Sequence, residues 1–136
     1  MEIEFPLEFL VPGTPVSGQA ARAESREAWK AKVKAASSKV IPSPHFASDQ
    51  RMAVTLYYLP EKPMVGDIDN IVKPILDALS RHLYLDDRQV ERVVVQKFEP
   101  GAGYQFKQPT AILARALAHR PVLYVRVSNN PFEELI

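Results

Sequence analysis

Hydrophobic and polar positions alternate along residues 2–11, which is typical of a half-buried strand. We expect this strand at a sheet edge, because Pro6 cannot donate a ladder hydrogen bond. The same alternation predicts a second strand over residues 52–60. Valine-rich residues 90–98 predict a third, central strand, and residues 122–127 a fourth. The apolar side of the first strand consists of Ile3, Phe5, Leu7, Phe9 and Val11.

Three segments carry apolar residues at helical rather than strand spacing. Residues 21–40 are rich in the helix formers Ala, Glu, Lys and Arg. Residues 70–83 predict a helix that buries one side, and residues 110–119 a short helix. Alternating strands and helices predict an α+β fold, a mixed sheet with helices packed on it. The apolar stripe of the first helix consists of Trp29, Val33, Ala36 and Val40.

The composition narrows the class of protein. A chain of 136 residues predicts a single domain over residues 1–136. The 17 Lys and Arg nearly balance the 16 Asp and Glu, which excludes a polycation that binds nucleic acid indiscriminately. There is no cysteine, so thiolate metal sites and cysteine nucleophiles are excluded. Apolar runs of membrane-spanning length are absent, and glutamates at positions 2 and 4 do not suit a secretory signal. We therefore expect a cytoplasmic protein with no membrane partner.

Basic residues recur every four positions along the first predicted helix, at Arg22, Arg26, Lys30 and Lys34. Residues four apart lie on the same helix face. Such a ladder is typical of a solvated surface. It also suits a stripe that follows the phosphates of a nucleic acid, so the pattern alone leaves both interpretations open.

Five aspartates lie within residues 66–90, and they flank the second predicted helix. Asp67 and Asp69 share a side only if the chain there is extended. Pro74 favours this arrangement, because its ring needs space at the carbonyl of Asn70, and we expect Asn70 to cap the helix. A helix of about 13 residues is about 20 Å long. The chain must therefore double back for the distal pair, Asp86 and Asp87, to reach the first pair.

Clustered carboxylates suit Mg²⁺, a hard ion that takes oxygen ligands and contacts substrate phosphates. Such an ion activates water and neutralises charge on a phosphoryl group. Lys73, one turn beyond the first pair, could stabilise the same charge. Asp77 is better explained as the i,i+4 partner of this lysine. Taken singly, each acidic pair is typical of a turn or a cap, and only the combination indicates a metal site.

The acidic segment within residues 66–90 resembles the RusA family of Holliday-junction resolvases. The resemblance implies a homodimeric α+β endonuclease that resolves four-way DNA junctions by paired Mg²⁺-dependent nicks, in recombination and repair, with Mn²⁺ as a substitute ion. By the same resemblance, Asp67, Asp69 and Asp87 match the metal-binding aspartates of the family. Lys73 matches its catalytic lysine. The resemblance also implies that Asn70 supports the site and that Asp86 has a secondary role. The residues that carry the resemblance are Asp67-Ile68-Asp69-Asn70, Lys73, Asp77-Ala78-Leu79, Leu85-Asp86-Asp87 and Gln89-Val90.

Two places depart from the family pattern. Gly18-Gln19-Ala20 and Met64-Val65-Gly66 stand where many members carry aromatic or basic residues. The ladder of basic residues on the first helix would then have to supply the grip on DNA. A catalytically inactive, DNA-binding relative is the alternative that these departures favour. A small-molecule phosphohydrolase that uses Asp-x-Asp is disfavoured, because the chain is short and Ile71 stands where that motif has Thr or Val.

Overall fold

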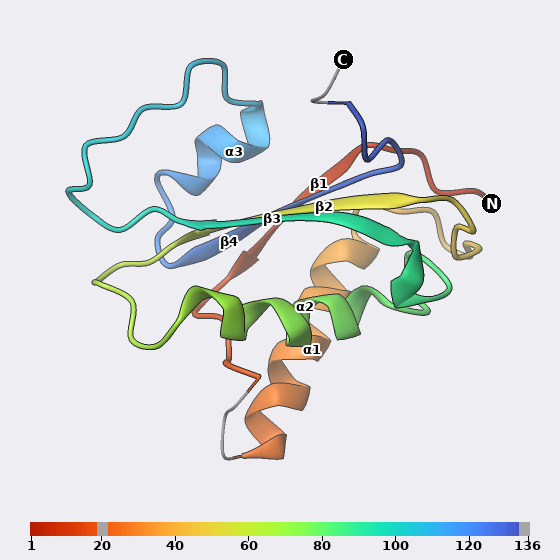
Figure 1. The fold of residues 1–136 in the computed structure, drawn as a ribbon, viewed down its shortest axis with the longest axis horizontal. Helices are drawn as coiled ribbons and strands as arrows, with labels where there is room; N and C mark the ends of the chain where they lie inside the picture. Colours follow the sequence, from red (N-terminus) through yellow and green to blue (C-terminus); the bar gives the residue numbers. More distant parts are fainter. Residues whose placement is uncertain (19–21, 134–136) are drawn as a thin grey trace.

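A computed structural model describes residues 1–18 and 22–133. Four strands form one mixed sheet in the order β1-β4-β2-β3, and helices lie on both of its faces (Figure 1). The expected α+β fold with a mixed sheet is therefore confirmed. The elements are β1 (Leu7–Pro12), α1 (Ala23–Ser38), β2 (Met52–Leu59), the 3₁₀ helix η1 (Ile68–Ile71), α2 (Val72–Leu79), the 3₁₀ helix η2 (Asp87–Gln89), β3 (Val90–Lys97), α3 (Ala111–Ala116) and β4 (Val122–Ser128).

The main core lies between the sheet and the helices α1 and α2. Alternate residues of β2 face these helices and are buried, as the alternation predicts. The other face of the sheet carries a smaller core under α3 and the loop before it, so β2 is buried on both faces. Figure 1 shows α1 and α2 on one side of the sheet and α3 on the other. The β2 residues of the main core are Met52, Val54, Leu56 and Tyr58.

β2 and β3 run parallel, with α2 as the connection between them. A parallel pair needs such a crossover, usually a helix. The remaining pairs, β1 with β4 and β4 with β2, are antiparallel. The crossover brings the chain from α2 back to the start of β3 through η2. The acidic residues 86 and 87 lie on this return.

The valine-rich strand β3 lies at a sheet edge, so the prediction that it is central is wrong. Val90 and Val95 pack against the main core, whereas Val93 is 40% exposed. β3 is rich in valine because β-branched side chains favour a pleated strand. The valines do not indicate that the strand is buried on both faces. β1 forms the other edge, as predicted, although it begins at Leu7 and Pro6 precedes it.

The first two predicted helices are shorter than expected. Within the described residues, α1 begins at Ala23, and residue 21, where the prediction began, lies outside them. It buries Trp29, Val33 and Ser37, while Val40 lies beyond its end and is 44% exposed. α2 ends at Leu79, and Arg81 then adopts a positive φ of 63°. The prediction ran on to position 83 because Leu83 lies in a turn that keeps one helix-like hydrogen bond. In it, the Leu83 amide donates to the Leu79 carbonyl.

Candidate active site

The first acidic pair lies where the loop after β2 turns into η1. Gly66 has a φ of +90°, a conformation that glycine adopts at no steric cost. Asp67 is extended and precedes the 3₁₀ helix, and its side chain makes no capping hydrogen bond. Asp69 lies inside the 3₁₀ helix, so the expectation that residues 67–69 are all extended is wrong. Both aspartates are exposed.

Pro74 leaves one backbone carbonyl at the start of α2 without its helical hydrogen bond. Because proline has no amide proton, the carbonyl of Asn70 lacks its usual helical donor. The amide of Gly18 donates to this carbonyl instead, at 2.6 Å. Asn70 itself is part of η1 and not the cap of α2, which corrects the sequence prediction. The loop before α1 is thereby tied to the start of the candidate site.

Lys73 lies on the exposed face of the first turn of α2. Its ammonium group donates to the carboxylate of Asp77 at 2.7 Å, which confirms the predicted i,i+4 pair. The hydrogen bond and the charge of Asp77 raise the pKa of Lys73, and the charge of Asp87 adds to the shift. Lys73 is therefore protonated at neutral pH, and Asp87 lies within electrostatic reach of it.

Tyr84 explains how the distal aspartate comes back toward α2. Its side chain is fully buried, and its hydroxyl lies 3.1 Å from the carbonyl of Leu76 and 3.4 Å from the Asp87 carboxylate. Burial, followed by the charge of Asp87, raises the pKa of Tyr84, so the hydroxyl remains a donor. The carboxylate of Asp87 is thus held beside the middle of α2. With 8 residues, α2 is about 12 Å long, rather than the length of about 20 Å that the sequence implied.

Asp86 performs a different task from its neighbour. Its carboxylate accepts from the Arg88 amide at 2.9 Å and caps η2. This hydrogen bond lowers the pKa of Asp86. Gln89 completes the capping box, since its side-chain oxygen accepts from the amide of Asp86. Asp86 therefore stabilises η2, and the secondary role at the site that the resemblance implies for it stays a prediction.

The structure brings together Lys73, Asp77, Tyr84 and Asp87 along one side of α2. Asp67 and Asp69 lie at the start of the same helical unit, and η1 also lies against β3. Among residues 1–18 and 22–133, no three Asp, Glu or His side chains form a group that could hold a metal ion. Asp67, Asp69 and Asp87 are therefore not gathered into such a group within the described residues. The donor chemistry of three carboxylates suits a hard divalent cation, and the assignment of Asp67, Asp69 and Asp87 as ligands stays a prediction.

The basic ladder of α1 is partly engaged with other residues. Lys30 pairs with Glu27 at 3.1 Å, while Arg22 and Lys34 are exposed. α1 packs directly against α2, so the ladder and the candidate site belong to the same helical layer. No helix in the described part of the chain has the length and apolar character that crossing a bilayer requires.

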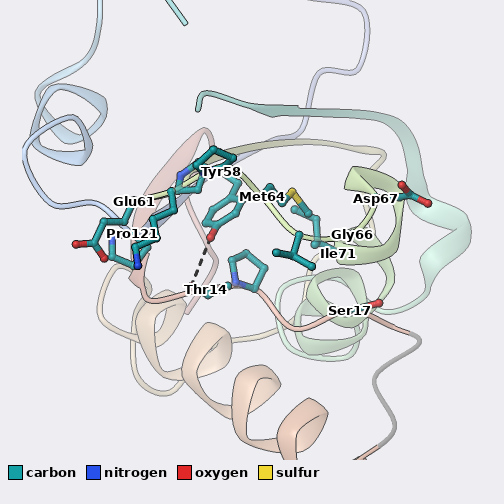
Figure 2. A pocket seen from close by; sticks show the side chains of 14 residues that line it. Thr14, Ser17, Tyr58, Glu61, Met64, Gly66, Asp67, Ile71 and Pro121 are labelled. Atoms are coloured by element: carbon teal, nitrogen blue, oxygen red, sulfur yellow. Dashed lines mark hydrogen bonds between the residues drawn. The ribbon is translucent and has the colours of Figure 1, made fainter. Parts of the chain in front are cut away.

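A cavity of about 390 Å³ adjoins the first acidic pair (Figure 2). The loop before α1, the end of β2 and residues 60–67 surround it, and Asp67 lies at its edge. The sequence analysis did not find this cavity or the role of Tyr84. Two signals in the sequence could have indicated these features. A tyrosine stands three positions before Asp87, and prolines lie on both sides of the cavity. The aromatic side chains of Trp29, Tyr58 and Tyr84 are buried in the core.

Comparison with known proteins adds one finding. The family model of the RusA endodeoxyribonucleases matches residues 13–103, which include α1, η1, α2, η2 and every predicted site residue. No curated protein matches the chain. The match covers more than half of the 136 residues. The chain therefore belongs to the RusA family of endodeoxyribonucleases.

Proposed function

We propose that this protein is a metal-dependent endonuclease that resolves four-way DNA junctions by paired nicks, in the cytoplasm, during recombination and repair. The observation that carries the proposal is the family match over the segment that holds Asp67, Asp69, Lys73 and Asp87. The position of Asp87 beside α2 supports it, because this carboxylate lies within electrostatic reach of Lys73.

In this proposal Asp67, Asp69 and Asp87 hold Mg²⁺, with Mn²⁺ as a substitute. The ion would supply Lewis-acid activation of water and of the phosphodiester. All three side chains are exposed, so both the ion and a DNA phosphate can reach them. Asp86 and Asp77 are not ligands, because the first caps η2 and the second pairs with Lys73.

Lys73 provides a positive charge for the phosphate that is cut. Its raised pKa keeps the ammonium protonated, and its side chain is 72% exposed. A phosphate that approaches can replace Asp77 as its partner, since an exposed ion pair of this kind is worth only about 0.3–0.5 kcal/mol. Lys73 thereby stabilises negative charge that develops during cleavage.

Junction binding would come from phosphate contacts along α1. The exposed Arg22 and Lys34 extend a basic surface over the helical layer that also holds the site. Binding of this kind weakens steeply as salt is raised, because counterions are released from the DNA. A homodimer would present two matched sites across a two-fold axis, which suits two symmetric incisions.

The test is cleavage of a synthetic four-way junction, with linear duplex DNA as the substrate control. We expect Mg²⁺-dependent paired nicks on the junction, and no cleavage in EDTA. Asp67→Asn should reduce cleavage at least about 100-fold, since metal assistance is worth several kcal/mol. Its junction affinity should be unchanged or tighter, because one negative charge facing the DNA is removed.

Glu4→Gln is the matched control, since it removes the same charge from an exposed position outside the site. It should cleave at the wild-type rate. Cleavage by Asp67→Asn at the wild-type rate would remove Asp67 from the site. Equal cleavage of duplex and junction would contradict the proposed substrate.

A catalytically inactive junction-binding protein is the second candidate. The exposed Val65 favours it, because this apolar side chain stands directly before Gly66 and Asp67, where many family members carry a basic residue. Salt-sensitive junction binding without nicks in Mg²⁺ or Mn²⁺ would support this candidate.

A further inference from the structure

The cavity beside Asp67 has a buried floor and an exposed rim. Pro15, Tyr58 and Ile71 line it and are buried, with Tyr58 3% and Ile71 2% exposed. Its volume of about 390 Å³ falls within the roughly 300–1,000 Å³ that is usual for small-ligand sites. Proline and core side chains form the floor, so the cavity is preformed.

The floor offers a neutral hydrogen-bonding group, and the charged residues that line the cavity, Glu61, Lys62 and Asp67, are exposed. The hydroxyl of Tyr58, on the floor, donates to the hydroxyl oxygen of Thr14, at the exposed rim, over 3.4 Å, as the dashed line in Figure 2 shows. This bond is long, and each hydroxyl keeps further capacity to donate or accept. An apolar surface with two neutral hydroxyls suits a flat, uncharged heterocycle that has polar edges.

The rim places this floor next to the proposed chemistry. Asp67 lines the cavity, and Figure 2 shows its carboxylate turned outward, away from Tyr58 and Thr14. Val65, at the same rim, is 96% exposed and offers an apolar contact to whatever enters. A nucleotide held here would have its phosphate at Asp67, outside the cavity, and its base inside.

We propose that this cavity receives one unstacked base of the DNA strand that is cut, next to the branch point. The inference rests on the proposed nuclease function and adds a base-binding site to it. Taking a base out of the stack costs a few kcal/mol, and least where pairing is already weakened. Base pairs at a branch point end a helix, so the cost there is low. The cavity thereby selects branched over continuous DNA and positions the phosphate beside Asp67.

The first experiment asks whether the base leaves the stack. Each nucleotide next to the branch point is replaced in turn by 2-aminopurine, whose fluorescence rises when it is unstacked. Wild-type protein is added in EDTA, so that the junction is bound but not cut. We expect a several-fold rise in fluorescence on the junction. Thr14→Phe, which fills the cavity from its exposed rim, should abolish the rise while binding persists.

The second experiment asks whether the cavity acts on that base during cleavage. Wild type, Tyr58→Phe and Thr14→Phe are each tested on the intact junction and on one with an abasic site at that nucleotide. In wild type, loss of the base should lower kcat/KM about 2- to 10-fold, the range for one or two lost contacts. Tyr58→Phe should lower kcat/KM on the intact junction and lessen the effect of the abasic site. The abasic site should cost nothing further in Thr14→Phe, because both changes remove the same contact.

Ala118→Phe controls for added bulk, since Ala118 is exposed and does not line the cavity. It should behave as wild type in both experiments. An unchanged 2-aminopurine signal would overturn the base-binding site. So would additive effects of Thr14→Phe and the abasic site on junction cleavage. Neither result would contradict the nuclease function itself. If wild type bound the junction but did not cut it, the proposed nuclease function would fail while the fluorescence experiment still tested the cavity.

Discussion

The two ends of α2 carry similar acidic residues in different surroundings. At its start, Asp67 precedes η1 without a side-chain capping bond and is exposed. At its far end, Asp86 caps η2, Gln89 closes the capping box and Tyr84 holds Asp87. The start therefore presents carboxylates that the fold does not use. At the far end, Asp86 stabilises the structure, and Asp87 is the proposed metal ligand.

This difference separates activity from stability. Changing a carboxylate at the start of α2 should affect the chemistry and leave the free energy of unfolding nearly unchanged. Changing the hydrogen-bonded residues at the far end should affect both, because the same bonds that stabilise the turn also orient Asp87. Asp67→Asn, described above, tests the start of α2, and three further measurements test its far end.

The largest effect is expected for the adjacent pair at the far end. Asp87→Asn should lower the rate of junction cleavage at least about 100-fold, since it removes a proposed ligand. Asp86→Asn should retain most of the rate, because Asn also accepts the capping hydrogen bond. Single-turnover rates in Mg²⁺ measure both. Equal losses would show that the two carboxylates do not divide structure and chemistry as the geometry indicates.

Gln89→Ala should have the next largest effect, on the free energy of unfolding. The carboxamide accepts from the amides of Leu85 and Asp86 and donates to the carbonyls of Ser48 and Gln50. Partly exposed hydrogen bonds each contribute about 0.5–1.5 kcal/mol at most, so we expect a loss of about 1–3 kcal/mol. Urea unfolding measures it, with the exposed Gln105→Ala as the matched control. If Gln89→Ala lowered the free energy of unfolding no more than Gln105→Ala does, the hydrogen bonds of Gln89 would not stabilise the fold.

The smallest effect is a pH dependence at His82, in the turn after α2. This side chain is buried and lies 2.8 Å from the Ser37 hydroxyl. Burial, then the nearby His45 and Lys34, lower its pKa below 6.5. The unfolded chain therefore binds a proton first as the pH falls, so the free energy of unfolding decreases below about pH 6.5.

Urea unfolding at pH 7.5 and pH 5.5 detects this decrease. His82→Gln should reduce the difference between the two pH values, whereas the exposed His119→Gln should not. The same pH dependence in wild type and His82→Gln would assign the effect to other groups.

The periodicity of the chain predicted most of the fold. Alternation in β1 and β2 identified the residues that face α1 and α2, and helical spacing located α2 near its true position. It failed for the position of β3, because a run of valines records strand preference and not the number of neighbouring strands. It also overextended α2, since Leu83 keeps helical spacing within a turn.

The candidate site was predictable only in part. The i,i+4 rule predicted the pair of Lys73 with Asp77, which the structure confirms. The roles that the resemblance gives to Asp67, Asp69, Lys73 and Asp87 stay predictions. The position of Asp87 depends on a long-range return through η2 and on the buried Tyr84, which local spacing does not encode. The cavity was hidden for the same reason, because Thr14, Tyr58 and Asp67 come from three separate segments.

The hydrogen bond from Gly18 to Asn70 has a mechanical consequence. A proline inside a helix usually only weakens it, yet here the vacated carbonyl fastens the loop that leads into α1. The segment that precedes the basic surface, the wall of the cavity and the helix that bears the acidic residues are therefore joined at one point. In the proposed nuclease, the segment that leads to the DNA-binding surface and the residues that surround the metal ion would therefore share one backbone hydrogen bond.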